Sequence, residues 1–215
     1  MDVEGADELL TTTRAVRRRL DLTRPVPREV ILDAIRVSEQ APVGSNQVSR
    51  WRWLVVTDAE TRATLAEIYR RAWQPYVEAV PVDELEGQVR RTFESGVFLA
   101  DHIHEVPVHV VPCVRRSRRA GPGPMPNAVA ASVYGSIFPS IWSFCLALRA
   151  RGVGSSITTM HLGSEDEVAQ LLGIPEDFLQ VALLPVAYYT GDNFRPAVRP
   201  PPEEITWFER WGKTT

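Results

Sequence analysis

The sequence predicts a single α+β domain in which a mixed sheet is flanked by helices. Three apolar segments rich in β-branched and aromatic residues indicate strands, at 51–57, 106–114 and 180–189. The segments around them show the spacing of three and four residues that is typical of helices. The resulting order of helices and strands is not the regular alternation of a parallel α/β fold. A chain of 215 residues with 44% hydrophobic residues fits one such domain.

Three helices are expected in the N-terminal half. The first covers about 6–19, and the second covers 27–40, opening on a proline that suits the first helical position. The third covers 58–71, where an aspartate can cap its first turn. Residues 72–105 are polar, and we expect one or two helices over roughly 83–104.

A long helix and a short helix are expected in the C-terminal half. Apolar residues recur at spacings of three and four over 128–151, and others lie between them, so this helix is buried on more than one side. Gly152 and Gly154 end it. Ser164 and Glu167 have the spacing of a capping box and open the short helix.

Charge and composition exclude several classes of protein. The net charge of −3 does not suggest a nucleic-acid binder. The acidic N-terminus does not resemble a secretory signal, and no apolar run approaches the length needed to span a bilayer. Cys113 and Cys145 lie in apolar runs, as buried thiols of a reduced protein do. We therefore expect a cytoplasmic protein with no nucleic-acid or membrane partner.

Four arginines lie close together near the N-terminus, at Arg14, Arg17, Arg18 and Arg19. On a helix, Arg14, Arg17 and Arg18 share one face. Guanidinium groups that converge in this way can bind a phosphate dianion through paired hydrogen bonds. The alternative from charge alone is a solvated, basic turn.

Three long segments resemble the FMN-dependent nitroreductase family in their order and spacing. They are TTRAVRRRLDLTRPVPREVILDAIRVSEQAPVGSNQVSRWRWLVVTD, ASVYGSIFPSIWSFCLALRARGVGSSITTMHL and LLGIPEDFLQVALLPVAYYTGDNFRPAVRPP. The resemblance implies a nitroreductase-like α+β fold, a mixed sheet flanked by helices. It also implies an intertwined homodimer with two FMN sites at the interface.

The resemblance implies phosphate-binding positions at both ends of the chain. Arg14 matches the family's first phosphate-binding arginine, Arg17 matches the nearby basic position, and Arg199 matches a late arginine that returns to the phosphate. Ala15 stands where many members have serine. Val198 stands where members often have lysine.

Two further segments match positions that lie against the flavin. The loop 42–47 matches the segment beside the ring, with Asn46 reaching the ring or the ribityl chain. The turn 152–156 matches the segment whose backbone amides face the isoalloxazine, and its glycines allow close approach. His161 lies just beyond this turn, and two roles stay open for it: a position at the ring or the substrate of a flavin site, or that of a core or surface histidine. The expected cofactor-binding residues are Arg14, Ala15, Arg17, Arg18, Pro42, Gly44, Ser45, Asn46, Gly152, Gly154, Ser155 and Arg199.

The function implied is that of an NAD(P)H-dependent FMN oxidoreductase. NADPH or NADH gives hydride to the flavin N5, and an electron-poor acceptor such as a nitroarene, a quinone or an activated alkene then takes the electrons in a ping-pong mechanism. The flavin carries this chemistry, so no catalytic side chain is demanded of the protein. The alternatives are another flavin branch, acting by dehalogenation or dehydrogenation, and a non-catalytic flavin-binding or sensing protein.

Two other patterns in the sequence are weaker. His102, His104, His109 and Cys113 match no established zinc spacing, so no metal site is expected. The glycines at 152 and 154 follow a helix and lack a third glycine, which argues against a dinucleotide-binding turn.

The expected organisation is one nitroreductase-like domain over 1–215. Residues 72–127 form a possible lid or excursion, in which the basic loop 115–119 helps to admit anionic substrates. The tail 193–215 is expected to embrace the partner of the homodimer. Its large aromatic residues favour docking on a second subunit; they are Trp207, Phe208 and Trp211.

Overall fold

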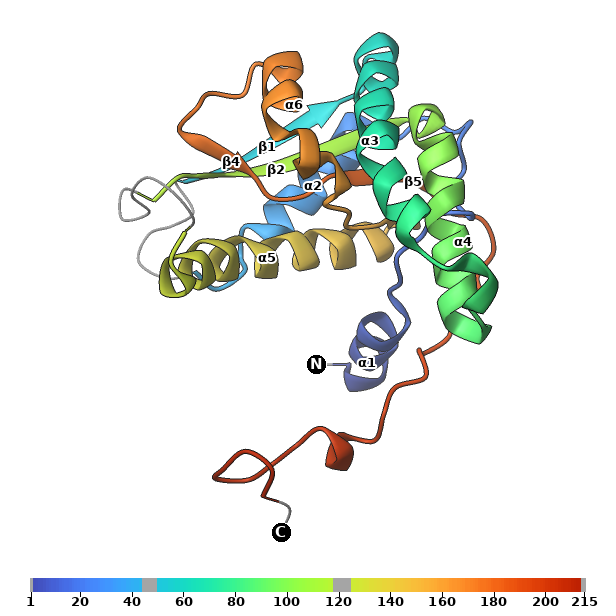
Figure 1. Ribbon diagram of the computed structural model, residues 1–215, viewed down its shortest axis with the longest axis vertical. Coiled ribbons are helices and arrows are strands. Elements are labelled where there is room, and N and C mark those ends of the chain that lie inside the picture. Colours follow the sequence, from blue (N-terminus) through green and yellow to red (C-terminus); the bar gives the residue numbers. More distant parts are fainter. Residues whose placement is uncertain (1, 44–49, 118–124, 214–215) are drawn as a thin grey trace.

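A computed structural model describes residues 2–43, 50–117 and 125–213 of the chain. In these residues a five-stranded sheet is covered by helices on both faces (Figure 1). The helices are α1 (Val3–Thr12), α2 (Arg28–Ser38), α3 (Ala59–Ala79), α4 (Gly87–His102), α5 (Asn127–Arg149) and α6 (Glu165–Leu172). The strands are β1 (Trp51–Val56), β2 (Val108–Arg115), β3 (Val153–Ser155), β4 (Phe178–Gln180) and β5 (Leu184–Tyr188).

Strand β2 organises the sheet. On one side it pairs with the whole length of β1, and on the other side it pairs first with β5 and then with β4. Strand β3 pairs with β5 at the far edge. The expected α+β class is confirmed, with the difference that every described pairing is antiparallel, whereas a mixed sheet was expected.

Two apolar cores lie on the two faces of the sheet. One lies between the sheet and the helices α2 and α5, and the other lies between the sheet and α3, α4 and α6. Because β2 has a core on each side, its side chains are buried from Val108 through Val114, which explains its continuous apolar run. Helix α5 contributes fully buried residues such as Ile137, Ile141 and Phe144.

The first helix is shorter than expected. Helix α1 ends at Thr12, and the arginines follow it in extended chain and a turn, so they do not share one helical face. Thr13 already has extended backbone angles, and its hydroxyl donates to Leu9 O at 2.6 Å. Beyond it, the backbone N–H of Val16 donates to Ser155 O instead of continuing the helix.

Other boundaries also differ from expectation. Helix α3 continues to Ala79 with Pro75 inside it, well past residue 71. Ser164 makes no side-chain capping hydrogen bond to α6, so the expected capping box does not form. Strand β3 occupies the place where only a turn was expected, and the last expected strand is divided into β4 and β5.

Helix α5 is long and apolar enough to cross a membrane by length and composition alone, contrary to the expectation from the sequence. Its mean hydropathy is 1.4. In the structure it packs against both the sheet and α2, as a core helix does. Its exposed face nevertheless carries large rings, Phe138 and Trp142.

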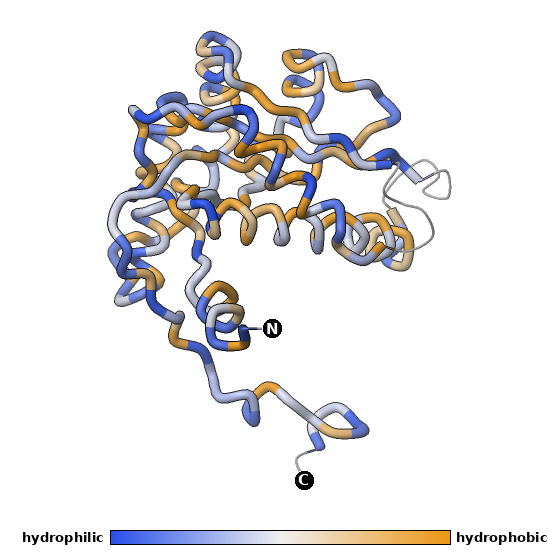
Figure 2. Tube along the Cα trace, turned by 180° about the vertical axis from the view of Figure 1, so that it is seen from behind, coloured by the Kyte–Doolittle hydropathy of each residue, from blue (hydrophilic) through white to orange (hydrophobic). Residues whose placement is uncertain are grey.

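The two ends of the chain lie away from the helix–sheet body. Figure 2 shows the C-terminal tail leaving the body and running past α1. The tail has little regular structure, and its apolar side chains at Ile205, Phe208 and Trp211 are exposed. Trp207 and Trp211 contact each other, with ring centres 4.2 Å apart.

Candidate functional site

Residues 14–19, which we call the arginine segment, lie along the edge strand β3. The N–H of Val16 donates to Ser155 O at 2.9 Å. A Cβ added at Gly154 would lie 2.9 Å from the Cβ of Val16, so only glycine permits this close approach. The structure thus brings together two expected parts of the site that are far apart in sequence.

Arg14 joins this segment to the C-terminal tail. Its Nε and Nη2 donate to Arg195 O at 3.2 and 3.0 Å. Its remaining hydrogen bonds go to Thr11 O and Thr13 O, at 2.8 and 3.0 Å. Arg14 therefore fixes the path of the tail that carries Arg199.

Arg17 and Arg18 face helix α4. Arg17 Nη1 donates to Ser95 Oγ at 3.3 Å, and partial burial lowers the pKa of Arg17 below its ordinary value. Arg18 is exposed and lies 3.7 Å from the carboxylate of Glu94. The two side chains thus turn away from the tail contact made by Arg14.

Arg19, which the sequence did not single out as a site residue, holds the start of the tail. Its Nε donates to Thr190 O at 2.6 Å, and its guanidinium lies 4.0 Å from the centre of the Phe194 ring. The guanidinium of Arg149 lies 4.3 Å from the same ring centre. Two cations from distant segments of the chain therefore lie close to the Phe194 ring, and no local sequence pattern predicts these contacts.

The remaining expected residues are only partly placed. Gly44, Ser45 and Asn46 lie outside the described residues. Pro42 and Ala15 are exposed. Arg199 is exposed in the tail and makes no hydrogen bond or ion pair with the part of the chain that the structure describes.

Buried polar groups follow β3. The hydroxyl of Ser156 is buried and has no partner among the described residues. Thr158 Oγ1 and the Tyr69 hydroxyl lie 3.0 Å apart. Burial raises the pKa of Tyr69, while the Thr158 hydrogen bond and the charge of Arg17 oppose that rise. The contact between Thr158 and Tyr69 connects helix α3 to the segment that follows β3, which we call the glycine strand because it contains Gly154.

A pocket of about 800 Å³ opens between α3 and α4. Arg17 and Thr158 line one part of it, and Trp73, Tyr76 and Phe93 line another. This size is usual for small-molecule sites. The aromatic residues on α3 have helical spacing in the sequence, but they lie in the stretch that we treated only as polar.

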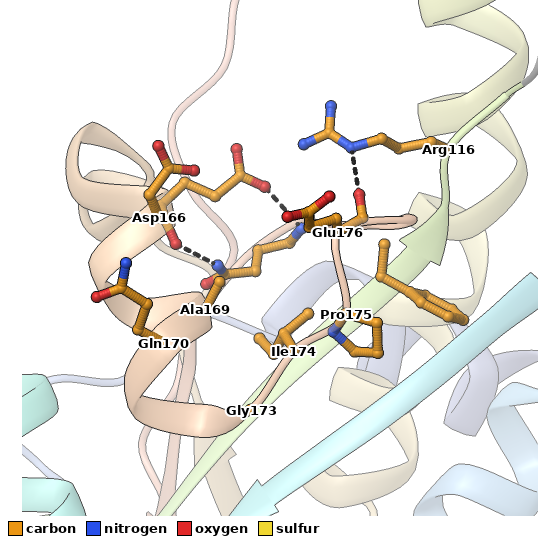
Figure 3. Close-up of a pocket in the computed structure, with 11 residues that line it drawn as sticks. Arg116, Asp166, Ala169, Gln170, Gly173, Ile174, Pro175 and Glu176 are labelled. Atoms are coloured by element: carbon orange, nitrogen blue, oxygen red, sulfur yellow. Dashed lines mark hydrogen bonds between the residues drawn. The ribbon is translucent and has the colours of Figure 1, made fainter.

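A second hollow lies between α6 and β4, on the side of the molecule shown in Figure 3. Its Arg116 Nε donates to Glu176 O at 2.9 Å, and the nearby Arg115 lies 3.3 Å from the Asp177 carboxylate. These arginines belong to the basic loop expected to admit anionic substrates. They are instead bound to the turn before β4, and the remaining arginines of the loop, Arg118 and Arg119, lie outside the described residues.

Two histidines are buried in the core. Burial lowers the pKa of His109 and of His161 to about 4 in each case. His109 Nε2 lies 2.8 Å from Ile103 O, whereas neither ring nitrogen of His161 has a partner among the described residues. No group of three or more possible metal ligands gathers in the described ranges.

The chain matches the model of a known protein family. The model of the nitroreductase family matches residues 10–188, which include the arginine segment, the sheet and the glycine strand. The chain belongs to the nitroreductase family.

Solved structures share the fold at low sequence identity. A BluB-like flavoprotein from Clostridium difficile 630 is 20% identical, with a TM-score of 0.71 over 98% of this chain and 100% of that one. An iodotyrosine deiodinase bound to FMN and 3-iodo-L-tyrosine is 20% identical, with a TM-score of 0.67 over 96% and 98%. A point mutant of NfnB, an FMN and NADPH-dependent nitroreductase derived from Sphigopyxis sp. strain HMH, is 19% identical, with a TM-score of 0.68 over 96% and 99%.

Proposed function

We propose that this protein is an FMN-dependent oxidoreductase that passes electrons from NADPH or NADH to an electron-poor acceptor. One observation carries the proposal: the arginine segment lies directly against the glycine strand β3, joined by the hydrogen bond from Val16 N to Ser155 O. That contact puts cationic side chains beside a backbone edge with no side chain at Gly154.

The residues present fit FMN. Its phosphate is a dianion, and Arg14, Arg17 and Arg199 supply positive charge of the kind that binds it. A side chain added at Gly152 would meet no atom within 4 Å, so there is open space beside this backbone. The buried Ser156 hydroxyl has an unused hydrogen-bonding capacity that a polyol or a ring edge can meet.

The remaining expected contacts complete this proposed site. Ala15, Arg18 and Ser155 belong to the two segments already joined, and Pro42 begins the loop that would lie against the flavin. Gly44, Ser45 and Asn46 of that loop would supply its polar groups. Held by these residues, FMN would supply the chemistry that carries electrons between the nicotinamide and the second substrate.

The acceptor is proposed to be a nitroarene, a quinone or an activated alkene. Family membership supports oxidoreductase chemistry, and the NADPH dependence stated for NfnB supports a nicotinamide as the reductant. A ping-pong mechanism follows if one open pocket serves both substrates in turn. The pocket between α3 and α4, which reaches Arg17, is the candidate for that role.

We further propose a homodimer in the cytoplasm. The exposed rings Phe138 and Trp142 on α5, and Trp211 on the tail, are an apolar surface of the kind that a second subunit covers. Cys113 and Cys145 are both free and buried, which fits a reducing compartment.

The visible spectrum of the purified protein, followed by anaerobic addition of NADPH and of NADH, tests this function. We expect a yellow protein whose flavin absorption bleaches with at least one of them and returns when a nitroarene is added. A colourless protein that takes up no added FMN would refute the proposal. So would a bound flavin that neither nicotinamide reduces.

A variant pair ties the result to the site. Arg14→Met removes a proposed phosphate contact, and we expect a Kd for FMN at least about tenfold higher. Arg28→Met removes an exposed arginine at the start of α2 and should leave that Kd unchanged. Equal effects of the two changes would show that overall charge, and not the site, determines binding.

A further inference from the structure

The hollow between α6 and β4 has a volume of about 820 Å³ and an acidic lining. The carboxylates of Glu165, Asp166 and Glu176 line it, against the guanidinium of Arg116 alone, which leaves an excess of two negative charges among its described lining residues. Figure 3 shows Asp166 on the α6 side of the hollow and Glu176 on the opposite side. The negative charge is therefore divided between two places, with space between them.

Helix stability accounts for only part of this charge. Glu165 and Asp166 lie in the first turn of α6, where acidic residues stabilise a helix. Glu176 lies beyond the end of that helix, in the turn before β4. The carboxylates of Asp166 and Glu176 take part in no hydrogen bond or ion pair within the described part of the chain. Both are therefore available to a ligand.

Arg116 holds the turn that carries Glu176. Its Nε donates to Glu176 O at 2.9 Å, and its backbone N–H donates to Asp177 O at 2.8 Å. These contacts go to backbone oxygens and leave the charge of the Glu176 side chain unpaired. The turn is thus fixed in place with its carboxylate beside the hollow.

A buried amide in the lining lacks a hydrogen-bond donor. The side chain of Gln180 is 2% exposed, and its Nε2 donates to Glu165 O at 2.8 Å. Because the amide nitrogen faces a carbonyl, the other end of the amide is the oxygen. Gln180 Oε1 has no partner among the described residues, which is unfavourable for a buried acceptor. A donor that enters the hollow can supply the missing hydrogen bond.

These acceptors suit an elongated organic cation better than a metal ion. No group of three or more possible metal ligands gathers in the described residues, these carboxylates included. A metal ion needs several oxygens around one point, whereas a linear diamine carries two ammonium groups joined by methylene groups. Ile174, Pro175 and Phe178 give the hollow an apolar part against which such a chain can pack.

We propose that the hollow between α6 and β4 binds a linear aliphatic diamine. One ammonium group pairs with the carboxylates on the α6 side and donates the hydrogen bond that Gln180 Oε1 lacks. The other pairs with Glu176, and the methylene chain lies against Ile174 and Phe178. The site is separate from the proposed FMN site, and the hollow shares no described lining residue with the pocket between α3 and α4.

Isothermal titration calorimetry of the purified full chain with putrescine and with butylamine tests this site. The two amines have the same carbon chain and differ in the second ammonium group. The salt concentration is kept at about 0.15 M, where attraction between exposed charges is largely screened. We expect putrescine to bind with a Kd of about 1 mM or lower, and butylamine to bind about tenfold more weakly, because a charged hydrogen bond contributes about that factor.

Variants assign the binding to the hollow. Glu176→Gln should raise the Kd of putrescine to about that of butylamine, because one ammonium group loses its partner. Asp166→Asn should weaken the binding of both amines, and Gln180→Met should do the same if it stays folded. Glu67→Gln is the matched control, because it removes an equal charge from an exposed residue of α3 that does not line the hollow.

Three results would overturn the proposal. They are equal Kd values for putrescine and butylamine, putrescine binding that Asp166→Asn and Glu176→Gln leave intact, and displacement of putrescine by an equal concentration of MgCl₂. If Gln180→Met does not fold, the two carboxylate variants decide. FMN content and reduction by NADPH are measured on the same samples, and their failure would refute the proposed function without bearing on the diamine site.

Discussion

The guanidinium of Arg19 lies 4.0 Å from the centre of the Phe194 ring, and Arg19 Nε also donates to Thr190 O. The N-terminal arginine segment therefore holds the first residues of the C-terminal tail. A cation over an aromatic ring contributes about 0.5–2 kcal/mol, and the second cation, Arg149, lies over the same ring. This clamp fixes where the tail leaves the body.

Removing the ring should loosen the clamp. In Phe194→Ala, we expect hydrogen exchange over residues 189–195 to be about tenfold faster, because local opening there becomes easier. Hydrogen exchange measured by mass spectrometry checks this. Ile205→Ala, an exposed site farther along the tail, should leave the same peptide unchanged. Unchanged exchange in Phe194→Ala would mean that the backbone hydrogen bonds alone hold the segment.

A methyl group at position 154 should disturb the proposed flavin site. In Gly154→Ala, the new Cβ would lie 2.9 Å from the Cβ of Val16, so the arginine segment must move away from β3. We expect a loss of about 1–3 kcal/mol in the free energy of unfolding and weaker FMN binding. Urea denaturation and flavin titration measure the two effects. Gly163→Ala is the control, because its Cβ would lie at an ordinary 3.6 Å from Ala72.

The two buried histidines should make the fold sensitive to mild acid. The pKa of each is lowered from 6.5 to about 4, so the unfolded chain binds these protons first as the pH falls. The stabilisation is fully present above pH 6.5 and is lost as the pH falls towards 4. Each of His109 and His161 should therefore lower the free energy of unfolding at pH 5 by about 2 kcal/mol relative to neutral pH.

Urea denaturation at pH 7 and pH 5 measures this loss. His161→Gln should unfold with a smaller difference between the two pH values than the wild-type protein. His102→Gln is the control, because His102 is partly exposed and pairs with Glu105. An unchanged pH difference in His161→Gln would show that His161 does not carry the effect.

A charge on the exposed face of α5 should separate the proposed dimer. Trp142 is 40% exposed on that face, and Trp142→Glu would bury an unpaired carboxylate if a second subunit covers it. We expect the dissociation constant of the dimer to rise at least about 100-fold. Sedimentation velocity over a range of concentrations measures it. Val55→Glu changes a comparably exposed apolar residue on β1 and should leave the dimer intact. A wild-type monomer at all concentrations would contradict the proposal.

Local pattern was sufficient to predict the elements whose burial is uniform. Strands β1 and β2 and helix α5 were predicted within a few residues, because long apolar runs and regular spacing mark them. The family was also recognisable from the order of three segments, and the family model confirms it. The arginine segment and β3 were each expected to contact the flavin, and the structure shows that they lie against each other.

Features set by distant pairing were not predictable in the same way. The helix was extended to residue 19 because arginine is a good helix former, whereas the N–H of Val16 is taken by Ser155 O far along the chain. Strand β3 has only three residues, so it shows no periodicity of its own. The aromatic residues of the pocket between α3 and α4 were missed because the third helix was expected to end at about residue 71. Helix α3 instead continues to Ala79 with Pro75 inside it, and it carries Trp73 and Tyr76.

The contacts of the arginine segment also bear on when the protein can acquire a cofactor during its synthesis. Val16 can make its contact only after Ser155 has been synthesised. The contacts of Arg19 and Arg14 likewise require Thr190 and Arg195. Most of the sheet can pair before those last residues emerge from the ribosome, but the arginine segment has no fixed place until they do. A chain halted before residue 190 would thus hold much of its core and lack the cationic end of the proposed flavin site. If the proposed flavin site forms as described, capture of FMN there would follow the synthesis of residues 190–195.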